Sequence, residues 1–185
     1  MILGGLAAIG TYNAKRMLAY STLAQIGFIL VGIGWGTEVS LAAALLFSFN
    51  HSLIKSAMLM MAGYLSSRAP VKGASFENLT GLGKQLPVAG VLFFLGALAL
   101  AGLPPLNGFI SKFWLFKSGV EADHLWILAL IGFSGLLTLI YSVRAFQKIW
   151  WFADPEERKV KKGDSLLAPA LLIGLCILFG LWPER

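Results

Sequence analysis

The stretch PVAGVLFFLGALALAGLPPLNGFISKFWLFKSGV, residues 87–120, decides how this chain is arranged. It is apolar and longer than the roughly 20 residues that a helix needs to cross the hydrocarbon core of a bilayer. Gly102, Pro104, Pro105 and Gly108 interrupt it near its middle. Proline removes a backbone hydrogen-bond donor and clashes with the preceding turn, so a continuous helix is not expected there. The stretch therefore forms either two short spans or one broken span.

The composition places most of the chain in lipid. Apolar residues make up 57% of the 185 residues and charged residues only 13%, which leaves too little polar surface to cover a soluble globule. The net charge of +6 does not indicate nucleic-acid binding, because the basic residues fall in short loops and form no continuous patch. Lysine and arginine gather in this way in the inner loops of membrane proteins. The chain is therefore predicted to be an integral, multi-pass membrane protein.

The apolar runs predict an all-α transmembrane helix bundle with five to six membrane segments, in a single domain over residues 1–185. The predicted helices cover 1–12, 17–35, 40–66, 87–120 with its break, 124–152 and 165–182. The first run is too short to cross the hydrocarbon core. We expect Met1–Tyr12 to be the end of a spanning helix whose beginning is absent, as in a truncated or split subunit.

The loop charges favour one broken crossing at 87–120. With one crossing, the basic clusters share one side of the membrane, which is the usual bias, whereas two crossings would place the 144–162 cluster opposite Lys15 and Lys72. The basic side would hold Lys15, Arg16, Arg68, Lys72, Lys84, Arg144, Lys148, Arg158, Lys159, Lys161 and Lys162, and the other side Glu38, Glu121, Asp123, Glu184 and Arg185. Residues 87–120 are therefore predicted to form one discontinuous helix.

Lys112 is the first candidate site residue. It lies one to two turns after the proline pair, among apolar neighbours such as Phe113 and Trp114. Broken helices in transporters tend to lie near the ion or substrate site, where the unpaired backbone lines a polar cavity. The alternative is a simple kink, with Lys112 reaching out to the interface. Because a lysine in an apolar run is costly to insert, the interior position and a role in ion movement are favoured.

Lys55 and His51 form the second candidate site, inside LFSFNHSLIKSAMLMMAGYL at 46–65. Residues four apart share one face of a helix. Burial disfavours a charged amine and a like charge one turn away does the same, so Lys55 could exchange a proton near neutral pH, as histidine does readily. Asn50 and Ser52 add polar groups able to hold water. The alternative for His51 is a packing hydrogen bond to another helix, but its pairing with Lys55 favours a proton relay.

Four strings follow one another in an order that carries a family resemblance. They are AKRMLAYSTLAQIGFILVGIG at 14–34, NHSLIKSAMLMMAGYL at 50–65, NLTGLGKQLP at 78–87 and GLPPLNGFISKFWLFKSGVEA at 102–122. They resemble the antiporter-like subunits of respiratory complex I, a family that includes subunits of Mrp-type cation/proton antiporters and membrane-bound hydrogenases. The resemblance implies a bundle of inverted repeats, each with a broken helix and a half-channel, joined by a central file of charged residues and water. Only the C-terminal repeat is recognisable.

The resemblance also implies roles for single residues. Lys112 matches the lysine, or glutamate in some members, on the second broken helix near the exit half-channel. Lys55 and His51 match residues that lead protons toward it. Lys15 and Arg16 match a basic pair that opens a Lys-Arg-x-Leu-Ala-Tyr-Ser motif, where lipid-headgroup contact is as good an explanation as transport.

The chain departs from the family pattern in two places. Phe47 stands where many members have a second histidine, and Asn13 stands where many have an acidic residue before the basic pair. Both departures would reduce a relay. The first repeat, with its own glutamate and lysine, is missing from the chain.

The residues and the resemblance together predict a proton- or sodium-translocating subunit of a redox-driven pump or multisubunit antiporter. The predicted relay is Lys55, Lys112 and His51, with support from Asn50, Ser52, Lys15, Arg16, Pro104 and Pro105. We expect no catalysis by the chain alone, no cofactor and no metal, because nucleotide, flavin, metal and iron–sulfur motifs are absent from the sequence. Any NADH or quinone chemistry would belong to partner subunits of a translocase such as NADH-quinone oxidoreductase.

The expected partners are other membrane subunits of a respiratory or antiporter complex, including a chain that supplies the N-terminal repeat, and not nucleic acid. The expected location is a bacterial or archaeal cytoplasmic membrane, or an organellar energy-transducing membrane. The alternative function is a non-transporting structural subunit or truncated scaffold. Phe47, Asn13 and the missing repeat favour that alternative, whereas the retention of Lys55 and Lys112 despite their insertion cost argues against it. The sequence leaves open which ion moves, which complex is involved and which electron donor, if any, drives it.

Overall fold

The computed structural model describes residues 1–152 and 160–182, and of Lys84 only the backbone. Four charges used in the loop argument, Arg158, Lys159, Glu184 and Arg185, lie outside the described residues. The longer helices are α1 (Ile2–Gly10), α2 (Ala14–Trp35), α3 (Glu38–Arg68), α5 (Pro87–Ala101), α6 (Asn107–Glu121), α7 (Leu125–Phe146) and α8 (Leu167–Leu181). The short elements are α4 (Phe76–Leu79), the 3-10 turn η1 (Leu82–Gln85) and the π-helical turn η2 (Gln147–Trp151). The described residues form no strand, so the all-α prediction is confirmed.

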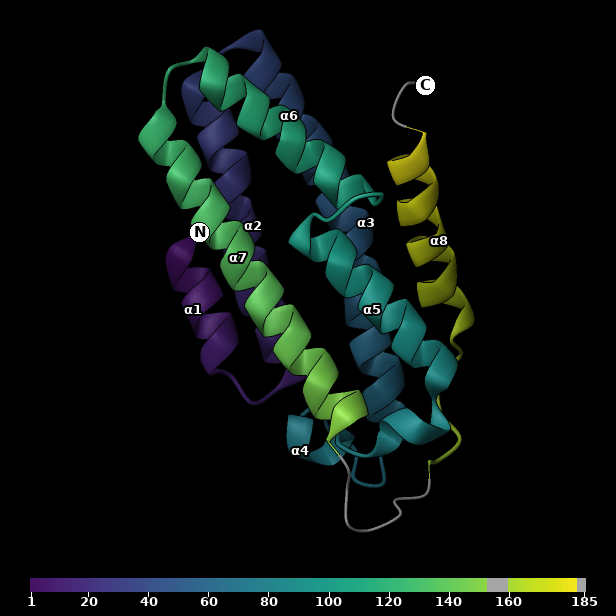
Figure 1. The fold of residues 1–185 in the computed structure, drawn as a ribbon. Coiled ribbons are helices and arrows are strands. Elements are labelled where there is room, and N and C mark those ends of the chain that lie inside the picture. The colour runs from purple at the N-terminus through teal and green to yellow at the C-terminus, as the bar shows by residue number, and fades with distance from the viewer. Residues whose placement is uncertain (153–159, 183–185) are drawn as a thin grey trace.

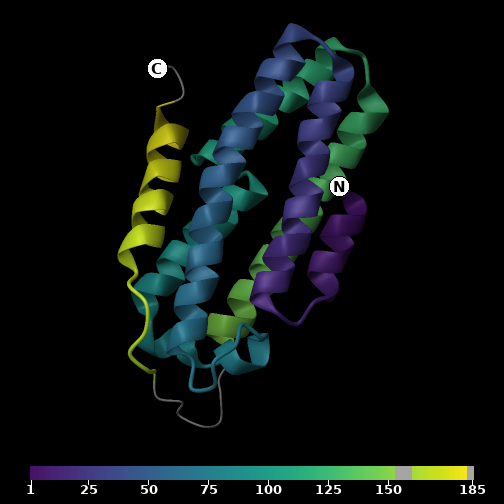
Figure 2. The same ribbon diagram turned by 180° about the vertical axis from the view of Figure 1, so that it is seen from behind.

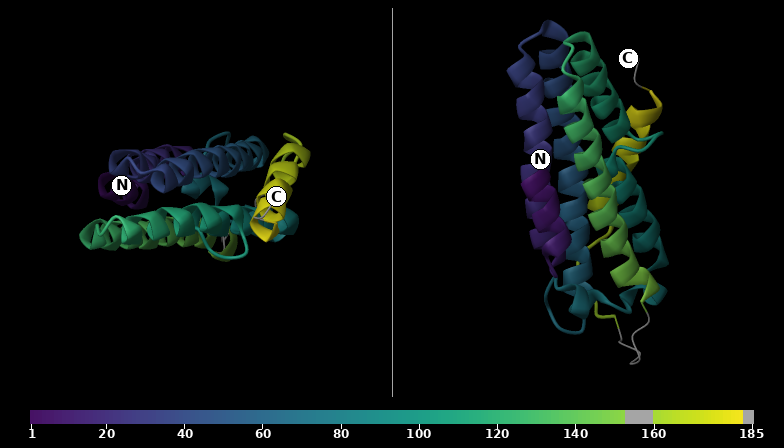
Figure 3. Two further views of the ribbon diagram at one scale, coloured as in Figure 1. Left: turned by 90° about the horizontal axis from the view of Figure 1, so that it is seen from above. Right: turned by 60° about the vertical axis from the view of Figure 1, so that its left-hand side comes forward.

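The helices form two layers. Seen from above, α1, α2 and α3 lie in one layer and α5, α6 and α7 in the other, and α8 closes one edge (Figure 3). The long helices alternate in direction, so the α2–α3 and α6–α7 turns lie together at one end of the bundle (Figures 1 and 2). The α1–α2 turn, the segment 69–86 and the end of α7 lie at the other end.

Charge divides between these two ends. The end with the α1–α2 turn, called the basic end below, carries Lys15, Arg16, Arg68, Lys72, Arg144, Lys148, Lys161 and Lys162. The opposite end carries Glu38, Glu121 and Asp123, with Lys117 paired to Glu121 at 4.0 Å. The basic loops of the described chain therefore share one end of the bundle.

Three helical segments of the described chain are long and apolar enough to cross a membrane. They are Ala14–Trp35, Glu38–Arg68 and Leu125–Trp151, and the last joins α7 to η2. Helices α5 and α8 are apolar but shorter, with 15 residues each. Apolar side chains cover the outside of these helices, as expected for a bundle that lies in lipid.

Local capping explains where α2 and α3 begin, which is earlier than the apolar pattern predicted. Asn13 Oδ1 accepts hydrogen bonds from the backbone N–H groups of Lys15 and Arg16, at 3.0 and 3.1 Å, and so caps α2. Thr37 caps α3 through a reciprocal pair of bonds with Ser40. Side-chain oxygens at these positions satisfy the free N–H groups of the first helical turn. Asn13 therefore caps α2, although the resemblance implies an acidic residue there in many family members.

The stretch 87–120 forms two helices with a break between them. Helix α5 ends at Ala101, Gly102 takes a left-handed conformation with φ +82°, and α6 begins at Asn107. Helices α5 and α6 lie end to end and together run the length that α7 runs alone (Figure 1). A Cβ at Gly108 would overlap the carbonyl oxygen of Ala99, so glycine lets the start of α6 approach the end of α5.

Two hydrophobic clusters fill the space between the layers. The larger one includes Leu18, Met58, Met61, Leu65, Phe93, Leu100 and Tyr141. The smaller one includes Phe28, Phe47, Leu115, Leu128 and Ile131. Along α2, α3 and α7 the residues of one cluster precede those of the other, and a polar belt separates them.

Replacing Gly108 by alanine tests the contact between α5 and α6. The new methyl group would collide with the Ala99 carbonyl, so Gly108→Ala should lower the free energy of unfolding by about 1–3 kcal/mol, as overpacking does. Gly135→Ala on α7 is the matched control, because its methyl group meets no atom within 4 Å. That control should be neutral or slightly stabilising, since alanine favours a helix over glycine. Thermal unfolding in detergent measures both, and equal midpoints would contradict the contact.

Candidate functional site

A belt of polar side chains crosses the bundle between the two hydrophobic clusters. It comprises Ser21 and Gln25 on α2, Asn50, His51 and Lys55 on α3, Asn107, Ser111 and Lys112 on α6, and Ser134, Thr138 and Tyr141 on α7. Buried polar groups are costly unless they are hydrogen-bonded, so a belt of this kind needs a partner for each member. The bonds within the belt therefore show what each side chain can do.

Lys55 points into the bundle. It is only 6% exposed, and its Nζ donates to the Leu18 carbonyl oxygen at 3.1 Å and to Ser21 Oγ at 2.8 Å. Both acceptors lie on α2, which neighbours α3 in the same layer. Within residues 1–152 and 160–182 no carboxylate forms an ion pair with Lys55. Neutral dipoles alone therefore accommodate this amine.

A series of hydroxyl and amide groups continues from Lys55 to α7. The Ser21 and Tyr141 hydroxyls lie 2.7 Å apart, and either can be the donor. The Tyr141 hydroxyl also interacts with the side chains of Gln25 and Thr138, and Gln25 Nε2 donates to Thr138 Oγ1 at 3.2 Å. Hydroxyl groups donate and accept, so the direction of this series can reverse. Lys55 is thereby connected through hydrogen bonds from one layer to the other.

Lys112 is held by the break between α5 and α6. Its Nζ donates to the carbonyl oxygens of Ala101 at 2.7 Å and Leu100 at 3.1 Å. The last carbonyls of a helix have no intrahelical partner and carry the negative end of the helix dipole, so they suit a cation. The ammonium also lies 5.3 Å from the centre of the Phe28 ring, a cation–π distance. The ending of α5 therefore creates the acceptors that Lys112 uses.

Asn50 and Asn107 join α3 to the start of α6. The Asn50 amide donates to the Asn107 carbonyl at 3.2 Å and to Ser111 Oγ at 2.7 Å, and Asn107 Nδ2 donates back to Asn50 Oδ1 at 3.1 Å. Both asparagines are buried. The pair fixes the register of α6 on α3, and so the position of Lys112 one turn further on.

His51 lies beside Lys112 at a very small cavity. His51, Lys112, Gln25 and Asn50 are among the residues that line a cavity of about 10 Å³, which has room for about one water molecule. His51 Nε2 is buried and has no hydrogen-bond partner among the described residues. The His51 ring lies against Phe47, with ring centres 6.4 Å apart, and Phe47 stacks on Phe28 at 5.4 Å. Phe47 therefore makes apolar contacts at the position where the resemblance implies a second histidine in many family members.

The structure brings together some of the residues singled out in the sequence and separates others. Lys55, His51, Asn50 and Lys112 lie in the polar belt, and Pro104 and Pro105 form the exposed turn of the break. Ser52 is exposed and donates to the carbonyl of Phe49 on its own helix. Lys15 and Arg16 are exposed at the basic end, away from the belt.

Several belt residues were missed from the sequence, although each carries a signal. Polar residues four apart recur on helices that are otherwise apolar, and residues at this spacing share a helix face. The missed residues are Ser21 and Gln25, Asn107 and Ser111, Ser134 and Thr138, and Tyr141. A search for paired polar residues within apolar runs would have found all but Tyr141.

Comparison with known proteins assigns the family. A family model described as NADH:quinone oxidoreductase/Mrp antiporter, TM, matches residues 1–138. The chain belongs to this family. The match confirms the resemblance seen in the sequence and covers α1 to α6 and most of α7, which hold the whole polar belt except Tyr141.

Relatives named as antiporter subunits and as respiratory-enzyme subunits align with the full chain. A Na(+)/H(+) antiporter subunit of Bacillus subtilis is 34% identical over 187 residues, covering 100% of this chain and 38% of that protein. An NADH-quinone oxidoreductase subunit of Desulforudis audaxviator is 32% identical over 200 residues, covering 100% of this chain and 40% of that protein. A chain in the structure of a membrane-bound sulfane sulfur reductase, an archaeal respiratory membrane complex, has 29% identity and a TM-score of 0.88, covering 98% of this chain and 37% of that chain.

The chain spans about two fifths of the length of these relatives. It is a polytopic membrane chain of a family whose members include antiporter and respiratory-complex subunits. The names of these relatives refer to whole proteins, whereas this chain, with its polar belt, aligns with only part of each.

Replacing Asn50 by leucine tests the link between α3 and α6. The change removes the partner of the Asn107 amide and one partner of Ser111, and a buried polar group left unpaired costs about 1–3 kcal/mol. Ser52→Ala, two residues along the same helix, removes a hydroxyl that bonds only its own helix and should change stability by less than about 0.5 kcal/mol. Chemical unfolding of the two variants measures the difference. Equal stabilities would show that the asparagine pair does not hold the helices together.

Proposed function

We propose that this chain carries part of a proton or sodium path in a multisubunit membrane complex. The observation that carries the proposal is the polar belt, in which Lys55 and Lys112 point into the bundle and, within the described part of the chain, are accommodated by neutral groups. Amines in the interior of a membrane bundle commonly mark ion or proton paths, because their insertion cost is otherwise uncompensated. Membership of a family that includes Na(+)/H(+) antiporter subunits supports this function.

The proposed relay uses three titratable groups, Lys112, His51 and Lys55. An ammonium without a nearby anion is stabilised less in the interior than in water, so small changes in its surroundings can change which group holds the proton. A water molecule in the small cavity would connect Lys112 with His51. Ser21 and Tyr141 would continue the path from Lys55 toward α7. Moving one charge works against about 2.3 kcal/mol per 100 mV of membrane potential, so a driving change must come from outside this chain.

The break between α5 and α6 would give the relay its moving part. We take α5 and α6 as one discontinuous crossing, because they lie end to end and together match the length of α7. The acceptors of Lys112 are free backbone carbonyls at the end of α5, and a small shift of that end would weaken both bonds. Such a shift would make the proton of Lys112 easier to release.

Other membrane subunits are the proposed partners. The relatives are named as subunits of antiporters and of NADH-quinone oxidoreductases, and the similar solved chain belongs to a respiratory membrane complex. Redox chemistry, where the complex performs any, would lie in those partners. A structural subunit without transport is the second candidate, and the narrow cavity with Phe47 packed beside His51 favours it.

Replacing Lys112 by methionine separates transport from a scaffold role. Methionine keeps much of the side-chain volume but removes the amine, so ion uptake by the assembled complex in vesicles should fall by about a hundredfold, as when a proton-transferring group is removed. Lys117→Met on the same helix is the matched control, because Lys117 is half-exposed and pairs with Glu121 at the end of the bundle. Uptake should stay near normal in that control. Dyes for pH and for sodium, read in parallel, identify the ion. Normal uptake with Lys112→Met would contradict transport through Lys112 and favour the scaffold role.

A double substitution tests whether the two lysines belong to one path. If Lys55→Met alone and Lys112→Met alone each block the same path, the double variant should be no slower than the slower single variant. Losses that multiply would indicate two independent paths and contradict a shared relay. The comparison requires equal amounts of assembled complex, which is measured by co-purification of the partner subunits.

A further inference from the structure

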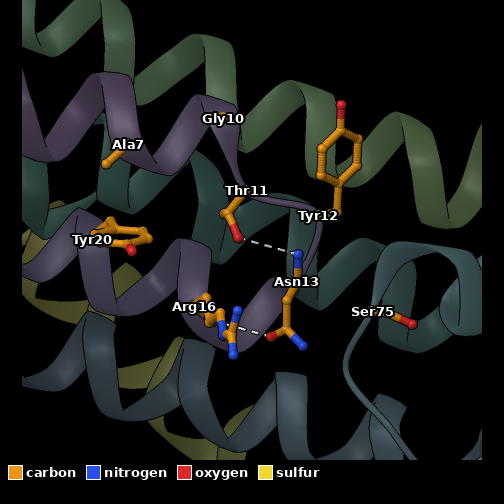
Figure 4. Close-up of a pocket in the computed structure, with 8 residues that line it drawn as sticks. All are labelled: Ala7, Gly10, Thr11, Tyr12, Asn13, Arg16, Tyr20 and Ser75. Carbon is orange, nitrogen blue, oxygen red and sulfur yellow. Dashed lines mark hydrogen bonds between the residues drawn. The ribbon is translucent and has the colours of Figure 1, made fainter.

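The basic end of the bundle holds a groove that the relay does not use. It has a volume of about 540 Å³ and lies between α1, the start of α2 and the segment that contains Ser75. Its lining residues are Ala7, Gly10, Thr11, Tyr12, Asn13, Arg16, Tyr20 and Ser75 (Figure 4). The groove has the size of a small-ligand site and contains no carboxylate among these residues.

Hydrogen-bond donors surround this groove, and none of them meets an acceptor in the described part of the chain. Arg16 contributes its guanidinium, because only its backbone N–H is used in the cap of α2. Asn13 accepts through Oδ1, which leaves its Nδ2 group available. The hydroxyls of Thr11 and Ser75 accept from backbone N–H groups, so their own hydrogens are also available. A groove that offers donors and a cation without an acid is suited to an anion.

Two further cations lie near the groove, although they do not line it. Tyr12 points away from Arg16 toward α7 (Figure 4), where Arg144 and Lys148 lie 5.4 and 5.1 Å from its ring centre. Neither cation forms an ion pair with a carboxylate anywhere in the residues that the structure describes. An adjoining groove on that side is lined by Lys148 and also by Glu77. The groove with Arg16 is therefore the better place for a negative charge.

The position of the groove identifies the source of the anion. It lies at the ends of the membrane-length helices α2 and α7, on the end of the bundle where the basic loops gather. Exposed aromatic side chains, Tyr12, Tyr20 and Trp151, surround this end, as at a membrane–water interface. Basic pockets between helices on the inner side of a membrane suit anionic lipid headgroups. The phosphate of a membrane lipid therefore lies at the same depth in the bilayer as the groove.

We propose that this groove binds the phosphate headgroup of an anionic glycerophospholipid, with Arg16 as its principal anchor. The guanidinium forms two parallel hydrogen bonds to phosphate oxygens, and Asn13 and the neighbouring hydroxyls complete the contacts. The bound lipid ties the α1–α2 turn to the membrane surface. This site is separate from the polar belt and does not depend on the proposed transport.

Lipid retention by the assembled complex tests the site. The complex is equilibrated with vesicles of phosphatidylcholine and phosphatidylglycerol, and retained lipid is counted by native mass spectrometry. Arg16→Gln should lower retained phosphatidylglycerol by about tenfold, because it removes the charge-assisted hydrogen bonds from the guanidinium to the phosphate, and leave phosphatidylcholine unchanged. Lys15→Gln is the matched control, because Lys15 lies in the same turn but does not line the groove. It should lower retention by less than about twofold. Co-purification of the partner subunits shows that each variant folds and assembles.

Three results would overturn the lipid site. Equal losses with Arg16→Gln and Lys15→Gln would show general surface attraction without a site. If soluble glycerol phosphate displaces the lipid at the same concentrations at which free phosphate binds, the groove would be assigned to a soluble phosphate ester. Loss of a partner subunit from Arg16→Gln with unchanged lipid content would assign it to an acidic protein segment. The same measurement on Lys112→Met should give normal retention, so failure of the transport proposal leaves this test readable.

Discussion

The rest of the structure depends on one constraint, the need to give an amine hydrogen-bond acceptors inside an apolar bundle. A continuous helix offers few, because its interior carbonyls already accept one bond from its own N–H groups and have only a second lone pair to share. The chain meets this constraint in two ways. At Lys112 it ends a helix, and the freed carbonyls of Leu100 and Ala101 become the acceptors. At Lys55 it uses a carbonyl of α2 and the hydroxyl of Ser21. The break between α5 and α6 and the polar belt thus both lower the cost of burying an amine in the bundle.

The two hydrophobic clusters keep this belt narrow. Aromatic stacking of Phe28 and Phe47 closes it on one side, and the methionine-rich packing of α3 closes it on the other. The belt consequently lies between apolar surroundings, with a cavity of about 10 Å³ beside His51. In such surroundings each hydrogen bond is stronger and each unpaired group is more costly than in water. Among the described residues, the belt atoms without a partner are His51 Nε2, Asn107 Oδ1 and Ser134 Oγ, and the arrangement is most easily changed at these atoms.

The sequence predicted the all-α membrane fold and the family because both depend on strong, local signals. Apolar runs of membrane length and the Gly-Leu-Pro-Pro-Leu interruption are visible without any knowledge of packing. The starts of α2 and α3 were predicted too late, since caps such as Asn13 and Thr37 lie outside the apolar runs. The acceptors of the two lysines could not be predicted, because Ser21 lies 34 positions from Lys55 and 120 from Tyr141 and only the packing of the layers brings them together.

The different acceptors of the two lysines give the belt a direction if it carries protons. A backbone carbonyl accepts a hydrogen bond but has no proton to pass on, so the bonds of Lys112 to Leu100 and Ala101 lead no further. Among the described residues, the small cavity offers its proton a way onward to His51. Lys55 instead bonds a hydroxyl, which can accept a proton on one side and release one on the other, and Tyr141 follows it. Lys112 is therefore suited to be an end point at the break, and Lys55 to be an intermediate that connects the two layers.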